Sequence, residues 1–141
     1  MPHTKNTNLH EYFKKKKVLI MGLGILGGGA GLAKFLAELG AKVTVTDLKT
    51  ETQLAPSLEK LRGLPIRYVL GKHQKKDFLE SDLIIRNPDV SLDNKFLKLA
   101  QKKNISVVMD ESLFLKLCPV PVIGVTGTRG KTTTTILIGE I

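Results

Sequence analysis

Cysteine, tryptophan and long apolar runs are scarce or missing in this sequence. It has one cysteine, Cys118, and no tryptophan in 141 residues. A single thiol cannot form an intrachain disulfide, which excludes a disulfide-stabilised secreted domain and is typical of a reducing compartment. No apolar run approaches the ~20 residues that span a bilayer, and the polar, basic start lacks the apolar stretch of a signal peptide. We therefore expect a cytoplasmic protein without a membrane segment.

Acidic residues are also few, with 13 Asp and Glu against 22 Lys and Arg and a formal net charge of +9. No Phe, Tyr or Trp is interleaved with the lysines inside the clusters at 72–76 and 98–103, although a groove for single-stranded nucleic acid would need such aromatic residues. We interpret these clusters as solvated helix faces and predict no nucleic-acid partner. The excess positive charge favours ligands that carry phosphate. We expect residues 1–15, which are polar and basic, to form a disordered leader.

Short apolar runs alternate with segments of helical periodicity. The strands we expect are residues 18–21, 42–46, 66–70, 83–85, 105–109 and 122–126. The helices we expect are residues 32–39, 54–61, a segment around 96–100, residues 111–117, and one that begins near Lys131. This alternation predicts an α/β fold, a Rossmann-like parallel sheet with helices on both faces. Ligands of such sheets bind at the carboxyl ends of the strands.

A first glycine-rich loop, G-x-G-x-x-G at Gly22–Gly27, directly follows a predicted strand and opens a helix. Glycine permits the tight turn and the close approach of backbone N–H groups to a phosphate, and the helix N-terminus adds positive charge. Asp47 lies 20 residues beyond Gly27, where an acid can bond a ribose hydroxyl. Further glycines at 28, 29 and 31 predict a loop longer than a minimal one. The pattern fits a dinucleotide or a nucleotide sugar, or glycines that only allow helix–sheet packing.

A second loop, Thr126–Thr132, contains the Gly-Lys-Thr core of a phosphate-binding loop. Backbone N–H groups of such a loop hold phosphates, the lysine reaches the β and γ oxygens, and the threonine hydroxyl can hold Mg²⁺. Val125 stands where the strict pattern has glycine, so this is a variant phosphate loop. The histidines, His3, His10 and His73, show no ligand spacing, and we predict no histidine metal site.

The segment 124–134 resembles the ATP loop of the Mur ligase family, T-G-T-N-G-K-[ST], with Arg129 in place of the usual asparagine. The upstream chain is similar to the D-glutamate-adding members of that family. The matching features are the loop Gly22–Gly27, Asp47 after the second strand, a turn at Asn87–Asp89 in place of the family's Ser-Pro-Gly, and the stretch Asp110–Phe114. The resemblance covers residues 16–141, nearly the whole chain.

The resemblance implies an ATP-dependent ligase of peptidoglycan precursor synthesis, and hence of cell wall biogenesis, cell shape and division. It implies D-glutamate addition to UDP-MurNAc-L-alanine through an acyl phosphate. It places the UDP-sugar at Gly22, Gly24, Ile25, Leu26, Gly27, Asp47, Leu48, Lys49, Asn87 and Pro88. It places ATP at Gly127, Thr128, Arg129, Gly130, Lys131, Thr132 and Thr133. Lys131 and Thr132 take the catalytic roles, with Thr132 as a Mg²⁺ ligand.

The resemblance also implies a division of the chain. Residues 16–118 correspond to a Rossmann-like UDP-sugar-binding domain, and residues 119–141 to the start of a truncated central ATP-binding domain. The other Mg²⁺ ligands, the adenine pocket and the D-glutamate site would lie in later domains. We therefore expect these 141 residues alone to lack ligase activity, and residues 122–141 to be sensitive to proteases. We predict no obligate protein partner.

Two alternatives remain open. One is another Mur ligase such as the L-alanine-adding enzyme, whose glycine pattern matches Gly22–Gly28 less well. The other is a non-catalytic NAD-binding Rossmann domain, which would have no use for a second phosphate loop at 126–132.

Overall fold

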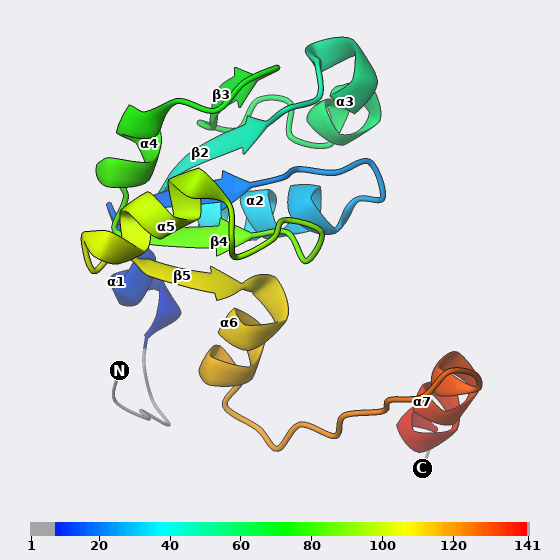
Figure 1. The fold of residues 1–141 in the computed structure, drawn as a ribbon. Helices are drawn as coiled ribbons and strands as arrows, with labels where there is room; N and C mark the ends of the chain where they lie inside the picture. The colour runs from blue at the N-terminus through cyan, green and yellow to red at the C-terminus, as the bar shows by residue number, and fades with distance from the viewer. Residues whose placement is uncertain (1–7, 141) are drawn as a thin grey trace.

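A computed structural model describes residues 8–140 and shows a five-stranded parallel sheet (Figure 1). The strands are β1 (Lys17–Met21), β2 (Lys42–Asp47), β3 (Arg67–Leu70), β4 (Leu83–Arg86) and β5 (Ser106–Met109). Their order is β3-β2-β1-β4-β5, and every neighbouring pair is parallel. The chain therefore runs outward from β1 to β3 and then returns to the other side of β1. This reversal leaves a crevice at the carboxyl ends of β1 and β4, the usual ligand position in such sheets.

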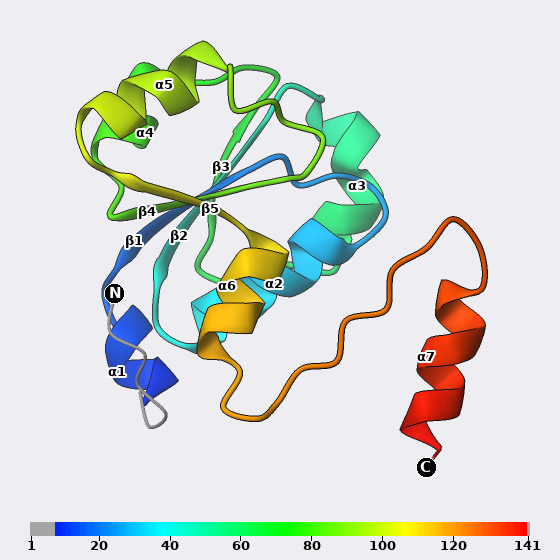
Figure 2. The same ribbon diagram turned by 60° about the horizontal axis from the view of Figure 1, so that its bottom comes forward.

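Helices cover both faces of the sheet, as Figure 2 shows. They are α2 (Gly28–Glu38), α3 (Glu51–Glu59), α4 (Lys75–Leu79), α5 (Lys95–Lys102) and α6 (Asp110–Leu117). Side chains of β1 alternate between the faces, as the pleat requires. Val18 and Ile20 pack in one core with α2, α3 and α6, whereas Leu19 and Met21 pack in the other with α4 and α5. The predicted Rossmann-like α/β fold is confirmed.

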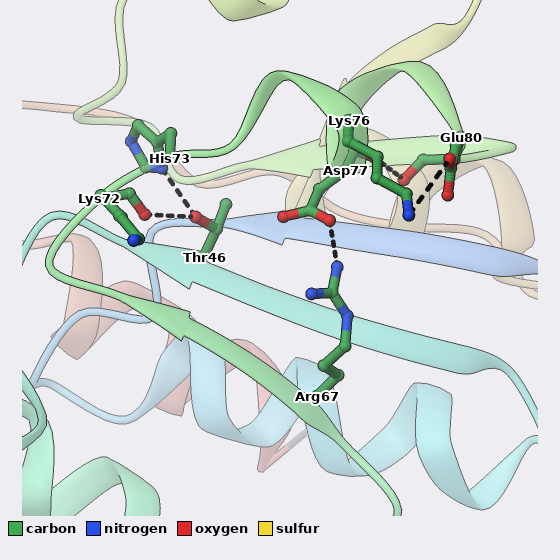
Figure 3. Close-up of polar contacts among 8 residues, drawn as sticks. Thr46, Arg67, Lys72, His73, Lys76, Asp77 and Glu80 are labelled. Carbon is green, nitrogen blue, oxygen red and sulfur yellow. Dashed lines mark hydrogen bonds and ion pairs between the residues drawn. The ribbon is translucent and has the colours of Figure 1, made fainter.

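Helix α4 was not predicted from the sequence. It has five residues, and Phe78 is its buried apolar anchor. Its buried carboxylate, Asp77, forms an ion pair with Arg67 of β3 (Figure 3). The helix is too short to show a helical period, so periodicity could not reveal it.

A short helix, α1 (Leu9–Phe13), occupies part of the segment for which we expected a disordered leader. That expectation is wrong for residues 9–13. The ring of Phe13 is fully buried in the core that contains α2, and Tyr12 packs edge-on against it with ring centroids 4.8 Å apart. Asn8 caps the helix through a hydrogen bond from the N–H of His10. An aromatic pair thus gives a basic segment enough apolar surface to order it. Residues 1–7 lie outside the described part of the chain.

The strand predicted at residues 122–126 does not form, and this expectation is wrong. The segment is exposed apart from a half-buried Val125, and it follows Pro119 and Pro121. No ladder connects it to the sheet of residues 17–109, and an apolar run without a neighbouring strand has no partner for its backbone groups. Helix α7 (Lys131–Gly139) begins at the predicted residue, and both ribbon views show it set apart from the sheet. Within residues 8–140, no helix has the length and apolar character to cross a membrane.

Candidate functional site

A cavity of about 190 Å³ lies at the carboxyl ends of β1, β2 and β4. Its lining contains predicted UDP-sugar residues from three separate stretches of the chain, together with residues that were not predicted. The predicted ones are Gly22, Gly24, Asp47, Leu48, Lys49 and Asn87, and the others are His73, Asp89 and Val90. Ile25, Leu26, Gly27 and Pro88 do not line it. The reversal of strand order between β1 and β4 brings these stretches together.

The loop after β1 needs glycine at the three glycine positions of its G-x-G-x-x-G pattern for two different reasons. Gly22, Gly24 and Gly27 have φ values of +91°, +66° and +98°, in the left-handed region that side chains rarely adopt. At Gly22, space is limiting as well, because a Cβ would lie 2.9 Å from the Cβ of Asn87. The loop therefore lies directly against the turn that follows β4.

The loop is not longer than a minimal one, contrary to the expectation from its extra glycines. Helix α2 begins at Gly28, so Gly28, Gly29 and Gly31 are all helical. A Cβ on Gly29 would lie 2.9 Å from the carbonyl carbon of Leu23, and closer still to its oxygen. Gly29 thus lets the first turn of α2 approach the backbone of the loop, which the sequence pattern did not reveal.

Asp47, at the end of β2, holds this loop through backbone hydrogen bonds. Its Oδ2 accepts from the N–H of Leu23 at 2.9 Å and from the N–H of Gly24 at 3.3 Å. Its Oδ1 accepts from the N–H of Lys49 at 2.9 Å. The side chain is buried, with 6% of its surface exposed. The carboxylate therefore connects the loop after β1 to the residues after β2, and both line the cavity.

Ser57 of α3 also holds this loop. Its fully buried hydroxyl donates a 2.7 Å hydrogen bond to the carbonyl of Gly24. Lys60 follows the same helix, and a Cβ on Gly27 would lie 3.1 Å from its Nζ. An ammonium group thus lies beside the N-terminus of α2. Neither residue was predicted, since both are far from the glycine loop in sequence.

The turn after β4 forms the third side of the cavity. The N–H of Asp89 donates to the side-chain oxygen of Asn87 at 3.0 Å, and the N–H of Val90 donates to the Asn87 carbonyl at 3.0 Å. The guanidinium of Arg86 donates to the carbonyl of Val90 at 2.8 Å. The Asn-Pro-Asp turn is therefore closed by its own hydrogen bonds and by the last residue of β4.

His73 is one of two titratable lining residues that were not predicted, the other being Asp89. It lies in the loop after β3, and its Nδ1 is 2.8 Å from the hydroxyl of Thr46 (Figure 3). Burial lowers the pKa of its imidazole, and the charge of Asp47 partly offsets this by raising it. The rule that ligand-binding residues follow the strands would have found it, because only two residues separate it from the end of β3.

The predicted ATP loop lies elsewhere. Gly130 is the N-cap of α7 with φ +78°, and the Nζ of Lys131 donates to the carbonyl of Gly127 at 2.6 Å. Residues 126–133 are exposed, and none of them lines the cavity described above. In the described range 8–140, no group of three or more His, Cys, Asp or Glu side chains is placed to hold a metal ion.

The chain matches the family described as Mur ligase MurD-like, N-terminal domain, over residues 16–109. It is 50% identical over 126 residues to a UDP-N-acetylmuramoylalanine–D-glutamate ligase of Roseiflexus sp. (strain RS-1). The matched region covers 89% of this chain and 27% of that relative. The chain thus spans about a quarter of the length of that relative.

Solved structures show the same likeness. A pseudomurein peptide ligase type C from Methanothermus fervidus has a TM-score of 0.58 at 29% identity, over 89% of this chain and 25% of the other. A UDP-N-acetylmuramate-alanine ligase, MurC, from Thermotoga maritima also has a TM-score of 0.58 at 29% identity, over 88% of this chain and 28% of the other.

Proposed function

Since the chain belongs to the Mur ligase family, with a MurD-like N-terminal domain, we propose that it is the nucleotide-sugar-binding part of a D-glutamate-adding ligase. The whole enzyme would add D-glutamate to UDP-MurNAc-L-alanine in the cytoplasm, through an acyl phosphate. One observation carries this proposal. The cavity at the reversal of strand order is lined by Gly22, Gly24, Asp47, Leu48, Lys49 and Asn87, which the resemblance assigns to the UDP-sugar.

The pyrophosphate side of the proposed site is the N-terminus of α2. Its N-cap, Gly27, has no side chain to bond the N–H groups of the first turn. These free donors and the helix dipole favour an anion. The Nζ of Lys60, beside Gly27, adds a positive charge at the same place. A diphosphate there would be stabilised by donors that are already in position before it binds.

The uridine side of the proposed site is the end of β2. Both oxygens of Asp47 accept backbone hydrogen bonds, but within residues 8–140 Oδ1 accepts only one, from Lys49. A carboxylate oxygen has a second lone pair, so Oδ1 keeps the capacity to accept from a ribose hydroxyl. Leu48 is exposed next to it and offers an apolar surface to the base.

The second loop has features that fit a phosphate. Gly130 adopts the left-handed conformation, the N-cap of α7 carries no side-chain hydrogen bond, and Lys131 extends across the loop to Gly127. We propose that Gly127, Thr128, Arg129, Gly130 and Thr133 hold ATP phosphates, with Lys131 on the β and γ oxygens and the hydroxyl of Thr132 on Mg²⁺. ATP would supply the phosphoryl group that activates the carboxylate.

The experiment that tests the proposal is calorimetric titration of the chain with UDP-MurNAc-L-alanine and, in parallel, with NAD⁺. We expect binding of the UDP-sugar alone. Asp47→Ala and Gly24→Val should abolish it, because both distort the loop. Asp93→Ala is the matched control, since the side chain of Asp93 is 88% exposed and outside the cavity lining. Binding of NAD⁺ alone would contradict the proposal and favour a dinucleotide domain. Binding of neither would contradict the claim that this part of the chain binds the nucleotide sugar by itself.

A further inference from the structure

The imidazole of His73 has a fixed position in the cavity wall. Its ring packs edge-on against Phe78 of α4 and Phe96 of α5, with centroid distances of 5.8 and 5.6 Å. Its Nδ1 bonds the hydroxyl of Thr46 at 2.8 Å, and the ring lines the cavity together with Asp47 and Asn87. Two rings and one hydrogen bond therefore determine how the imidazole faces a ligand.

The hydrogen bonds of Thr46 determine which nitrogen of His73 carries the proton. The Thr46 hydroxyl has one hydrogen and lies 3.2 Å from the carbonyl of Lys72 and 2.8 Å from Nδ1 of His73 (Figure 3). A carbonyl oxygen only accepts, so both contacts are hydrogen bonds only if the hydroxyl donates to Lys72 and Nδ1 of His73 donates to Thr46. In the neutral imidazole, Nε2 is consequently unprotonated and is an acceptor.

We propose that His73 is a binding residue of this site, and that its Nε2 accepts a hydrogen bond from the uridine part of the nucleotide sugar. This inference rests on the proposed function. Among residues 8–140, Nε2 has no hydrogen-bond partner, while Nδ1 is bonded to Thr46. The donors that uridine offers are the uracil N3–H and the ribose hydroxyls. The acceptor would favour uridine over a ligand that presents only acceptors at this point.

Charged groups surround the imidazole from several elements. Asp47 ends β2, Lys49 lies in the loop after it, and Asp89 lies in the turn after β4. Lys72 precedes His73 in its own loop, and on α5 the Nζ of Lys95 lies 5.2 Å from the ring centroid of Phe96. Burial outweighs the attraction of Asp47, so the pKa of His73 is lowered and the neutral acceptor form prevails at pH 7. Protonation would convert Nε2 into a donor and remove the acceptor.

A matched pair of substitutions tests the role of Nε2. The amide of His73→Asn can replace Nδ1 and bond Thr46, but it does not reach the position of Nε2. The longer His73→Gln places an amide at that position. For UDP-MurNAc-L-alanine we expect about three- to tenfold weaker binding by His73→Asn, the effect of one lost hydrogen bond, and nearly unchanged binding by His73→Gln. Thermal unfolding of both variants establishes that they are folded.

Three analogues of UDP identify the donor. An analogue methylated at uracil N3 lacks the N3–H, whereas 2′-deoxy-UDP and 3′-deoxy-UDP each lack one ribose hydroxyl. For the analogue without the true donor, wild type and His73→Asn should bind equally. A constant difference between wild type and His73→Asn for UDP and all three analogues would overturn the proposed contact.

Failure of this inference is distinguishable from failure of the proposed function. If wild type binds UDP-MurNAc-L-alanine and His73→Asn binds it equally well, only the role of His73 is wrong. If wild type does not bind it, the proposed function fails for this chain. Nitrogen-15 NMR of the imidazole then tests the inference without a ligand. An unprotonated Nε2 at pH 7.5 supports it, and a protonated Nε2 overturns it.

Discussion

Substitution of Gly29 by alanine should distort the site, although Gly29 does not line it. Gly29 lies in the first turn of α2, and the nearest atoms to an added Cβ belong to the backbone of Leu23. These atoms are the loop itself, which cannot rotate away as a side chain could. Within residues 8–140, a Cβ added at Gly31, two residues later, would meet no atom within 4 Å apart from its chain neighbours and the backbone of its own helix. The two substitutions are thus chemically identical but sterically different.

The magnitude follows from the distances. An ordinary van der Waals contact of a Cβ begins at 3.4 Å, whereas alanine at position 29 would place it 2.9 Å from the Leu23 carbonyl carbon. The helix and the loop would have to separate by more than the difference between these two distances, because the Leu23 carbonyl oxygen is closer to the added Cβ than the carbonyl carbon is. Overpacking of this kind costs about 1–3 kcal/mol. Both substitutions gain up to ~1 kcal/mol of helix propensity. The difference in unfolding free energy between the two variants isolates the strain.

Urea denaturation measures this difference. We expect Gly31→Ala to be as stable as wild type or more stable by up to ~1 kcal/mol. We expect Gly29→Ala to be less stable than Gly31→Ala by about 1–3 kcal/mol, and to bind the nucleotide sugar more weakly because Leu23 and Gly24 move. Equal stability of the two variants would refute the close approach of α2 to the loop.

Three further predictions concern other parts of the described chain. Asp47→Ala should lower the unfolding free energy by about 2–4 kcal/mol, because it leaves the buried N–H of Leu23 and two other donors without their acceptor; a loss below ~0.5 kcal/mol in urea denaturation would contradict this role. Phe13→Ala should cost about 3–5 kcal/mol if α1 belongs to the core, and an unchanged thermal midpoint would show that it does not. The folded state lowers the pKa of His73, so the unfolded chain binds the proton more tightly. Stability should be complete above the ordinary histidine pKa of about 6.5 and decline as the pH falls below it. His73→Gln should remove this part of the decline, and an unchanged pH profile of stability would argue against it.

The fold could be predicted because buried parallel strands are short continuous apolar runs. Residues 18–21 and 83–85 are such runs, and they lie in β1 and β4, two interior strands of the sheet. The glycine loop and Asp47 could be predicted as parts of one site for a related reason. Each directly follows a strand, and the carboxyl ends of parallel strands meet at one edge.

The errors share a physical cause, namely contacts between residues distant in sequence. The segment 122–126 has the composition of a strand, yet a strand exists only where a neighbour supplies hydrogen bonds. The glycines at 28, 29 and 31 were interpreted through helix propensity, whereas the steric requirement at Gly29 comes from Leu23 across the turn. From the sequence, His73 was considered only as a possible metal ligand, and the spacing of the histidines cannot reveal a residue that binds an organic ligand. Its position depends on Thr46, 27 residues earlier.

The hydrogen bonds of Asp47 give a physical account of why an acid after the second strand accompanies a glycine-rich loop. Glycines make the loop tight but also flexible, and a flexible loop would lose entropy when it orders around a phosphate. Asp47 holds the N–H groups of Leu23 and Gly24, and Ser57 holds the carbonyl of Gly24. The loop is therefore fixed before a ligand arrives, which lowers the entropic cost of binding.

A loss of affinity in Asp47→Ala would include this positioning effect. Ser57→Ala removes another hydrogen bond that holds the same loop and leaves Asp47 in place, so its loss of affinity measures the effect of loosening the loop. A greater loss in Asp47→Ala contains two contributions, the additional loop hydrogen bonds that Asp47 accepts and a direct contact with the ligand.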